Sequence, residues 1–238
     1  MENHCNITFT REIPLRYETD VFIAGGGPAG VAAALAAAYN GASVYLAEGL
    51  SCFGGAGTAG LVPAFMQFTN GVDFLAGGIG QKILNKLRAE GGNDPHKGIS
   101  IKVEVLKRVY DELMLESGVN FTFHTQLIGV ETEGGKISRV ILSSKSGIFA
   151  AKAKIYIDCT GDGDLAAWAG APFEKGNEEG VMMAGTLCSL WAGIEWDKVV
   201  RPDSRKLEEA FKDPAYALSL GREDELLAIE EVAIEAMN

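Results

Sequence analysis

The strongest constraint on the fold is a short apolar segment that runs directly into a cluster of glycines. Residues 20–24 favour a β-strand and lead into the run GGGPAG at 25–30, after which residues 31–40 are mostly alanine. This order predicts a strand, a tight glycine turn and a helix that ends at Gly41. Residues 42–47 are continuously apolar, as parallel buried strands are. The segment is therefore predicted to form one βαβ unit.

The glycines of this turn have the spacing of a dinucleotide-binding motif. Gly25 permits a sharp turn, Gly27 lets the backbone approach a phosphate, and Gly30 lets the helix pack closely on the strands. The helix N-terminus then offers amide groups and a positive dipole to a pyrophosphate. Glu48, 18 residues after Gly30, can accept a ribose hydroxyl and would repel the 2′-phosphate of NADP. FAD and NAD both fit this pattern, and a structural turn without a ligand is the alternative.

The rest of the chain alternates between short predicted elements and glycine-rich loops. A second loop, at 51–60, is too rich in glycine to be regular structure and must turn sharply or lie close to a ligand. A strand at 154–160 runs into Gly161 and a short helix at 165–169, which repeats the strand, glycine and helix pattern. The other predicted elements are helices at 79–89, 103–116, 206–212 and 223–237, and strands at 120–125, 127–132, 137–143, 148–151 and 185–194.

Charge and cysteine usage exclude several classes of protein. The formal net charge of −11 repels phosphate backbones and anionic membrane surfaces, so nucleic acid is not expected as a partner. No secretory signal precedes residue 20, and the apolar stretch 21–38 contains glycines and a proline that indicate two buried elements rather than a membrane span. The four cysteines are far apart and lack metal-ligand spacing, which favours free thiols in the cytoplasm.

Three segments of the chain resemble a known family. They are DVFIAGGGPAGVAAALAAAYNGASVYLAE at 20–48, CFGGAGTAGLVPAF at 52–65 and AKIYIDCTGDGDLAAWAGAPFEKG at 153–176. Together they resemble FAD-dependent oxidoreductases of the glutathione-reductase-like flavoprotein superfamily, in the group akin to fumarate reductase flavoproteins. The resemblance implies an α/β, Rossmann-like FAD-binding domain over residues 1–175, with a parallel central sheet and a small antiparallel β meander. Residues 176–238 would begin a substrate or cap domain.

The resemblance also implies which residues hold FAD. Glu48 would bind the adenosine ribose, and Leu127, after Gln126, would lie beside adenine. The remaining implied residues bind the pyrophosphate (Gly25, Gly26, Gly27, Pro28, Ala29 and Gly30), line the flavin end (Gly54, Gly55, Gly57 and Thr58) or form the motif that returns the chain to the cofactor (Thr160, Gly161 and Asp162). No catalytic side chain is predicted, since the isoalloxazine carries the redox chemistry.

The implied function is hydride transfer between FAD and a small organic substrate. The paired cysteines of a disulfide reductase are missing, and the second glycine loop has no histidine for covalent flavin attachment. Two alternatives stay open: a non-catalytic flavin-binding module or subunit that needs a partner chain, and an NAD-dependent Rossmann dehydrogenase. The second of these does not account for the loop at 52–60 or the motif at 158–164.

Chains of this family extend well beyond 238 residues, and their later segments complete the flavin site. The resemblance therefore predicts weak FAD retention, an exposed apolar patch at 187–194, and self-association or pairing with a second chain. The competing expectation is a monomer in which the helices at 206–212 and 223–237 cover this patch. Aromatic residues at 65–68 and 187–196 are candidates to face a substrate, although ordinary packing is the simpler interpretation.

Overall fold

The computed structural model describes residues 10–65, 68, 70, 72–93, 100–183 and 185–195. The helices predicted at 206–212 and 223–237 lie outside these residues. The chain divides into two units, Met1–Cys188 and Ser189–Asn238, and every described helix and strand belongs to the first. The proposed domain boundary between residues 175 and 176 stays a prediction.

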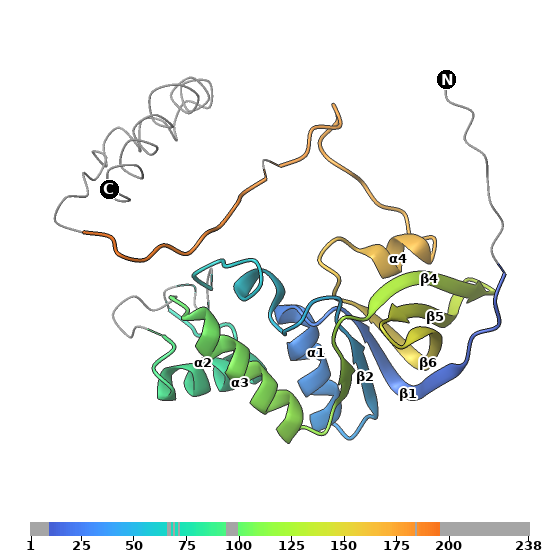
Figure 1. Cartoon of the computed structure of the whole chain (residues 1–238), viewed down its shortest axis with the longest axis horizontal. Helices are drawn as coiled ribbons and strands as arrows, with labels where there is room; N and C mark the ends of the chain where they lie inside the picture. The colour runs from blue at the N-terminus through green and yellow to red at the C-terminus, as the bar shows by residue number, and fades with distance from the viewer. Residues whose placement is uncertain are drawn as a thin grey trace. The chain divides into compact units, whose positions relative to one another are not determined.

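The first unit is an α/β structure around a six-stranded sheet with the order β3-β2-β1-β6-β5-β4 (Figure 1). The four strands from β3 to β6 in this order run parallel, whereas β5 is antiparallel to both β6 and β4. The sheet therefore confirms the expected parallel core joined to an antiparallel meander. The strands are β1 (Leu15–Ala24), β2 (Val44–Ala47), β3 (Asn120–Thr122), β4 (Gln126–Glu133), β5 (Lys136–Ser144) and β6 (Gly147–Asp158).

The meander and the parallel core share one strand, where the sequence predicted two. Residues 147–151 of β6 pair with β5, and residues 150–158 pair with β1. The predicted break between 148–151 and 154–160 is thus wrong. No glycine or proline interrupts 148–158, so the strand has no reason to end before its second partner is reached.

The strand predicted at 185–194 is also wrong. The described residues of this segment are irregular, and no described strand pairs with them. Leu187 is 95% exposed. Bulky apolar residues suggested a strand here, but a strand needs a neighbour that takes up its backbone hydrogen bonds.

Helices cover one face of the parallel sheet. The helices α1 (Pro28–Tyr39), α2 (Ile79–Ala89) and α3 (Val103–Glu116) lie together on this side (Figure 1). Their buried residues join those of β1 and β2 in one core that includes Leu35, Leu46 and Leu106. On the opposite face, β4, β5 and the short helix α4 (Asp164–Trp168) enclose a second core around Phe22 and Tyr45. The central strands are therefore covered on both faces.

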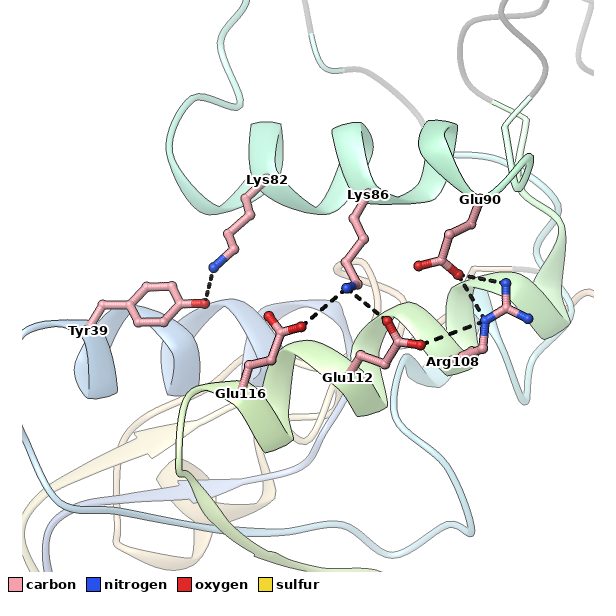
Figure 2. Close-up of polar contacts among 7 residues, drawn as sticks. All are labelled: Tyr39, Lys82, Lys86, Glu90, Arg108, Glu112 and Glu116. Atoms are coloured by element: carbon pink, nitrogen blue, oxygen red, sulfur yellow. Dashed lines mark hydrogen bonds and ion pairs between the residues drawn. The ribbon is translucent and has the colours of Figure 1, made fainter.

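A row of ion pairs fixes α2 against its neighbours (Figure 2). Lys86 of α2 lies 2.8 Å from Glu112 of α3, and Arg108 of α3 lies 2.6 Å from Glu90. Lys86 and Arg108 each lie between two carboxylates, and because these side chains are partly exposed, each pair contributes little to stability. Further contacts in the row join Lys86 to Glu116, Arg108 to Glu112, and Lys82 to the hydroxyl of Tyr39 on α1.

Asp111, also on α3, takes no part in this row of ion pairs. The Oδ1 atom of Asp111 is buried and has no hydrogen-bond partner in the described part of the chain. Burial raises the pKa of this carboxyl above its ordinary value. The folded chain therefore binds the proton more readily than the unfolded chain. Ionised Asp111 lowers stability at neutral pH, and this cost disappears as the pH falls through the raised pKa.

We expect Asp111→Asn to raise the free energy of unfolding at mildly alkaline pH. The gain should be less than about 1 kcal/mol, because solvent reaches part of the side chain. Urea denaturation at alkaline and acidic pH measures it, and the gain should shrink in acidic buffer. An equal gain at every pH would show that the charge of Asp111 is not its cause.

Within the described residues, no helix combines the length and the apolar character that crossing a bilayer requires.

Candidate functional site

An open groove lies at the carboxyl ends of three parallel strands. The last residues of β1, β2 and β6, which are Ala24, Ala47 and Asp158, all line it, and its volume is about 720 Å³. The chain leaves β1 toward β2 on one side, and β6 is the neighbour of β1 on the other side. The order of the strands therefore reverses at β1, and open α/β sheets bind ligands outside the carboxyl ends of the strands at such a point.

The glycine turn after β1 forms the centre of this groove and begins helix α1. Gly27 is the N-cap residue, and no side chain caps the helix. The amide of Gly25 donates to Ala47 O at 2.8 Å, and Pro28 has no N–H. The first hydrogen bond of the helix runs from Val31 to Gly27 O. The amides of Ala29 and Gly30 thus belong to the first turn, whose donors have no acceptor inside the helix.

Two glycines of the turn are required by the fold, and a third is not. A Cβ at Gly25, where φ is +94°, would lie 2.4 Å from Cys159 O, and a Cβ at Gly30 would lie 1.9 Å from Gly25 O. A Cβ at Gly27 meets nothing within 4 Å. Gly27 has an extended backbone that other residues can adopt, so its missing side chain matters to the groove rather than to the turn.

Glu48 is positioned beside this turn by two backbone amides. Its Oε2 accepts from Gly26 N at 2.5 Å, and its Oε1 accepts from Leu50 N at 2.6 Å. The residue is 6% exposed and lines the groove. Each carboxylate oxygen has a second acceptor position, so Glu48 can still accept hydroxyl donors from a ligand. The sequence indicated a ribose acceptor here, but not that the same carboxylate also holds the glycine turn.

The second glycine loop lies against the first. The amide of Gly54 donates to Gly26 O at 2.8 Å, and a Cβ at Gly55 would lie 3.2 Å from the Cα of Gly27. Gly55, in the 3-10 turn η1 (Gly55–Gly57), lines the groove together with Ala56. Thr58 is fully buried, and its hydroxyl donates to Phe53 O at 2.5 Å. Gly54, Gly57 and Thr58 therefore shape this loop from within and are not among the groove-lining residues.

The carboxyl end of β6 carries a polar network around Asp158, a residue that the sequence analysis did not predict to have a role. Oδ1 of Asp158 accepts from both the amide and the hydroxyl of Thr160, at 3.0 and 2.8 Å, and Oδ2 accepts from the amide of Ala166 at 2.8 Å. The Thr160 hydroxyl in turn accepts from the amides of Gly163 and Asp164. Burial raises the pKa of Asp158, but these hydrogen bonds outweigh it and hold the pKa below its ordinary value.

Most residues of this turn line the groove, but one predicted residue does not. Thr160 and Gly161 line it, and so do Cys159 and Asp164, whereas the predicted residue Asp162 is exposed and is not among the lining residues. An aspartate two residues before a threonine and next to a glycine turn is the local signal that could have pointed to Asp158.

We expect Thr160→Val to lower the free energy of unfolding by about 1–2 kcal/mol, because valine keeps the shape but loses a hydroxyl with three partners. Thr160→Ser keeps that hydroxyl and should stay close to the native value. Denaturant unfolding of the two variants distinguishes them. Equal stability of Thr160→Val and Thr160→Ser would show that the network does not hold the turn.

The far end of the groove is formed by residues that follow β2 and begin β4. Thr125, Gln126 and Leu127 line it. The side-chain amide of Gln126 lies 3.4 Å from Gly49 O, and the amide of Thr125 donates to Glu48 O. Leu127 is therefore at the end predicted for adenine, and its contact with a base stays a prediction.

Residues 20–234 of the chain match the family described as FAD dependent oxidoreductase. The chain belongs to this family of FAD-dependent oxidoreductases. No curated protein sequence matches the chain.

Several solved structures match parts of this FAD-dependent oxidoreductase at low sequence identity, each with a TM-score below 0.5. A geranylgeranyl bacteriochlorophyll reductase-like protein from Thermoplasma acidophilum is 19% identical, with 65% of this chain and 42% of that chain covered and a TM-score of 0.47. THI4 from Thermovibrio ammonificans is 19% identical, with 63% of this chain and 61% of that chain covered and a TM-score of 0.48. The p-nitrophenol 4-monooxygenase PnpA from Pseudomonas putida is 15% identical, with 67% of this chain and 44% of that chain covered and a TM-score of 0.49. The chain thus spans less than two thirds of each of these proteins.

The groove fits the cofactor that gives the family its name. FAD carries two ribose or ribityl segments joined by a diphosphate. The open space at Gly27 would admit a phosphate, and the uncapped N-terminus of α1 supplies the electrostatic attraction. The buried carboxylate of Glu48 offers acceptors for hydroxyl groups. These features are compatible with the diphosphate and the hydroxyl groups of FAD.

Proposed function

We propose that this member of the FAD-dependent oxidoreductase family binds FAD in the groove described above and transfers a hydride between the flavin and a small organic substrate. The observation that supports this most is the joining of two glycine loops at the switch point. The Gly54 amide reaches Gly26 O, and Gly27 opens into the groove. A single dinucleotide could thus extend from Glu48 past the start of α1 toward Gly55.

The chain's own residues would bind and orient the cofactor. When bound, FAD supplies the redox chemistry, as flavins do in other enzymes. The first turn of α1 would hold the diphosphate, and Glu48 would hold the adenosine ribose. Gly55 and Ala56 would approach the flavin end through their backbone, and the turn held by Asp158 would close the groove on the β6 side.

A second candidate function is a flavin-binding module that acts with further protein. Leu187, at the end of the first unit, is 95% exposed, and Met183 is 94% exposed. Apolar side chains presented in this way favour contact with additional protein, either another chain or a further domain. In that case the isolated chain would bind FAD weakly and would associate with itself or with a partner.

The experiment that tests the proposed function is anaerobic reduction of the flavin bound to the purified chain. After reconstitution with FAD and removal of free cofactor, small organic substrates are mixed with the protein and the visible absorption of oxidised flavin is followed. Bleaching by a substrate, and recovery with an acceptor, supports hydride transfer. Weakly retained FAD favours the module if no donor bleaches the bound flavin and no acceptor reoxidises it after chemical reduction.

A further inference from the structure

Phe53 has a fully buried ring to which the proposed function gives no role. The residue lies in the second glycine loop, directly before Gly54, and its exposed fraction is 0%. It belongs to the core on the helix side of the sheet and is not among the described residues that line the groove. Phe53 can therefore affect a ligand only through the segments that it contacts.

The Phe53 ring lies against the first glycine turn. A Cβ at Gly26 would lie 2.8 Å from Cδ1 of this ring, which is closer than side chains pack. The two segments are also joined through their backbones, because the amide of Gly54 donates to Gly26 O. The ring thus fills the space beside Gly26 and limits how closely the second loop approaches the first turn.

The same ring contacts two aromatic residues at the end of β3. The ring centroids of Phe53 and Phe121 are 4.9 Å apart in an edge-on geometry, and those of Phe53 and Phe123 are 4.7 Å apart. These are distances of favourable aromatic pairs. Two residues after Phe123 the chain reaches Thr125, which lines the far end of the groove and whose amide donates to Glu48 O.

The backbone of Phe53 adds a contact within the second loop. Its carbonyl oxygen accepts from the buried hydroxyl of Thr58 at 2.5 Å. The first turn, the far end of the groove and the second loop therefore meet at one residue. Under the proposed function, these three segments hold the diphosphate, the adenosine and the flavin end of FAD.

The three segments do not depend on Phe53 equally. The first turn has support of its own, because the amide of Gly26 donates to Glu48 whatever side chain stands at position 53. The amide of Gly25 likewise donates to the end of β2. A smaller side chain at position 53 should consequently displace the second loop more than the first turn.

We propose that Phe53 is a positioning residue that fixes the spacing between the adenosine part of the groove and the loop at the flavin end. This inference rests on the proposed function and deepens it by naming a residue outside the groove that sets the fit of the flavin half of the cofactor. A ligand that ends before the flavin should be insensitive to this spacing, whereas FAD must fit both parts at once.

The test compares FAD with ADP-ribose, which carries the adenosine and the diphosphate but no flavin. Calorimetry gives the dissociation constants of both ligands for the full native chain and for Phe53→Leu, a substitution that keeps most of the volume but removes the ring. We expect Phe53→Leu to weaken FAD binding about tenfold and ADP-ribose binding less than about threefold. At saturating protein, the visible spectrum of bound FAD should also shift toward that of free FAD, because the surroundings of the flavin tune its electronic properties.

Two further variants separate positioning from loss of core packing. Phe149 is 2% exposed, lies in the second core and does not line the groove. Phe149→Leu should lower the thermal stability as Phe53→Leu does, but leave the ratio of the two dissociation constants and the flavin spectrum unchanged. Phe123→Leu removes one partner of the Phe53 ring and should move the ratio in the same direction by a smaller factor.

The inference is overturned if folded Phe53→Leu has the native ratio of dissociation constants, or if Phe149→Leu changes that ratio equally. Should Phe53→Leu fail to fold, the ratio in Phe123→Leu decides: the native value contradicts the inference, and a selective loss of FAD affinity supports it. Absence of FAD binding in the native chain would instead count against the proposed function itself.

Discussion

Replacing Gly27 by valine should abolish FAD binding while the chain stays folded. The Cβ added at Gly27 meets no atom of the protein within 4 Å, and the backbone there, with φ −63° and ψ −176°, suits residues other than glycine. The new side chain would instead occupy the space that we assign to the diphosphate. We expect affinity to fall by about 100-fold or more, which corresponds to about 3 kcal/mol. Fluorescence titration with FAD measures the loss, and thermal unfolding of the free protein shows whether the fold persists.

Two other glycines provide the controls for this variant. A Cβ at Gly185 also meets nothing within 4 Å but lies outside the groove, so Gly185→Val should bind FAD normally. Gly30→Ala should fail differently, because its Cβ would lie 1.9 Å from Gly25 O and the turn itself could not form. If Gly27→Val and the native chain had the same dissociation constant, the diphosphate would not lie at this turn.

The second large effect is expected at Glu48. Glu48→Ala removes both acceptors that hold the amides of Gly26 and Leu50 and also removes the proposed ribose acceptor. Hydrogen bonds to a charged group contribute about 1.5–3 kcal/mol each, so the free protein should lose stability and FAD affinity should fall by about tenfold to 100-fold. Glu48→Gln keeps one carbonyl acceptor and should be intermediate in both measurements.

The graded series at Glu48 is informative because stability and affinity are measured separately. Denaturant unfolding reports the contacts with Gly26 and Leu50, and FAD titration reports the ribose contact. Glu133→Ala, which removes an exposed strand carboxylate outside the groove, is the matched control. An Ala variant at position 48 that is destabilised but binds FAD as tightly as the native chain would restrict Glu48 to its structural role.

The βαβ unit could be predicted from sequence because its signals are local. An apolar strand, glycines at fixed spacing and a run of alanines lie within about one supersecondary unit, and each indicates the same structure. The same holds for α2 and α3, whose predicted bounds match the observed ones. The start of α1 at Pro28 rather than residue 31 follows from the preference of proline for the first helical turn.

The parts that could not be predicted depend on contacts between distant residues. The continuity of β6 is decided by β1 and β5, which pair with different parts of it. The amides that hold Glu48 come from two separate turns, and the role of Thr58 inside its loop depends on Phe53 O. Sequence spacing identified the residues around the groove, but it could not separate those that line it, such as Gly55, from those that shape it, such as Gly54.

The central claim is that FAD binds at the glycine turn after β1. Equilibrium titration of the native chain and of Gly27→Val with FAD, with both proteins shown to be folded under the same conditions, tests it most directly. Our account predicts saturable, stoichiometric binding by the native chain, competition by ADP-ribose, and no measurable binding by Gly27→Val. Equal binding by the two folded proteins, or no saturable binding by the native chain, would contradict it.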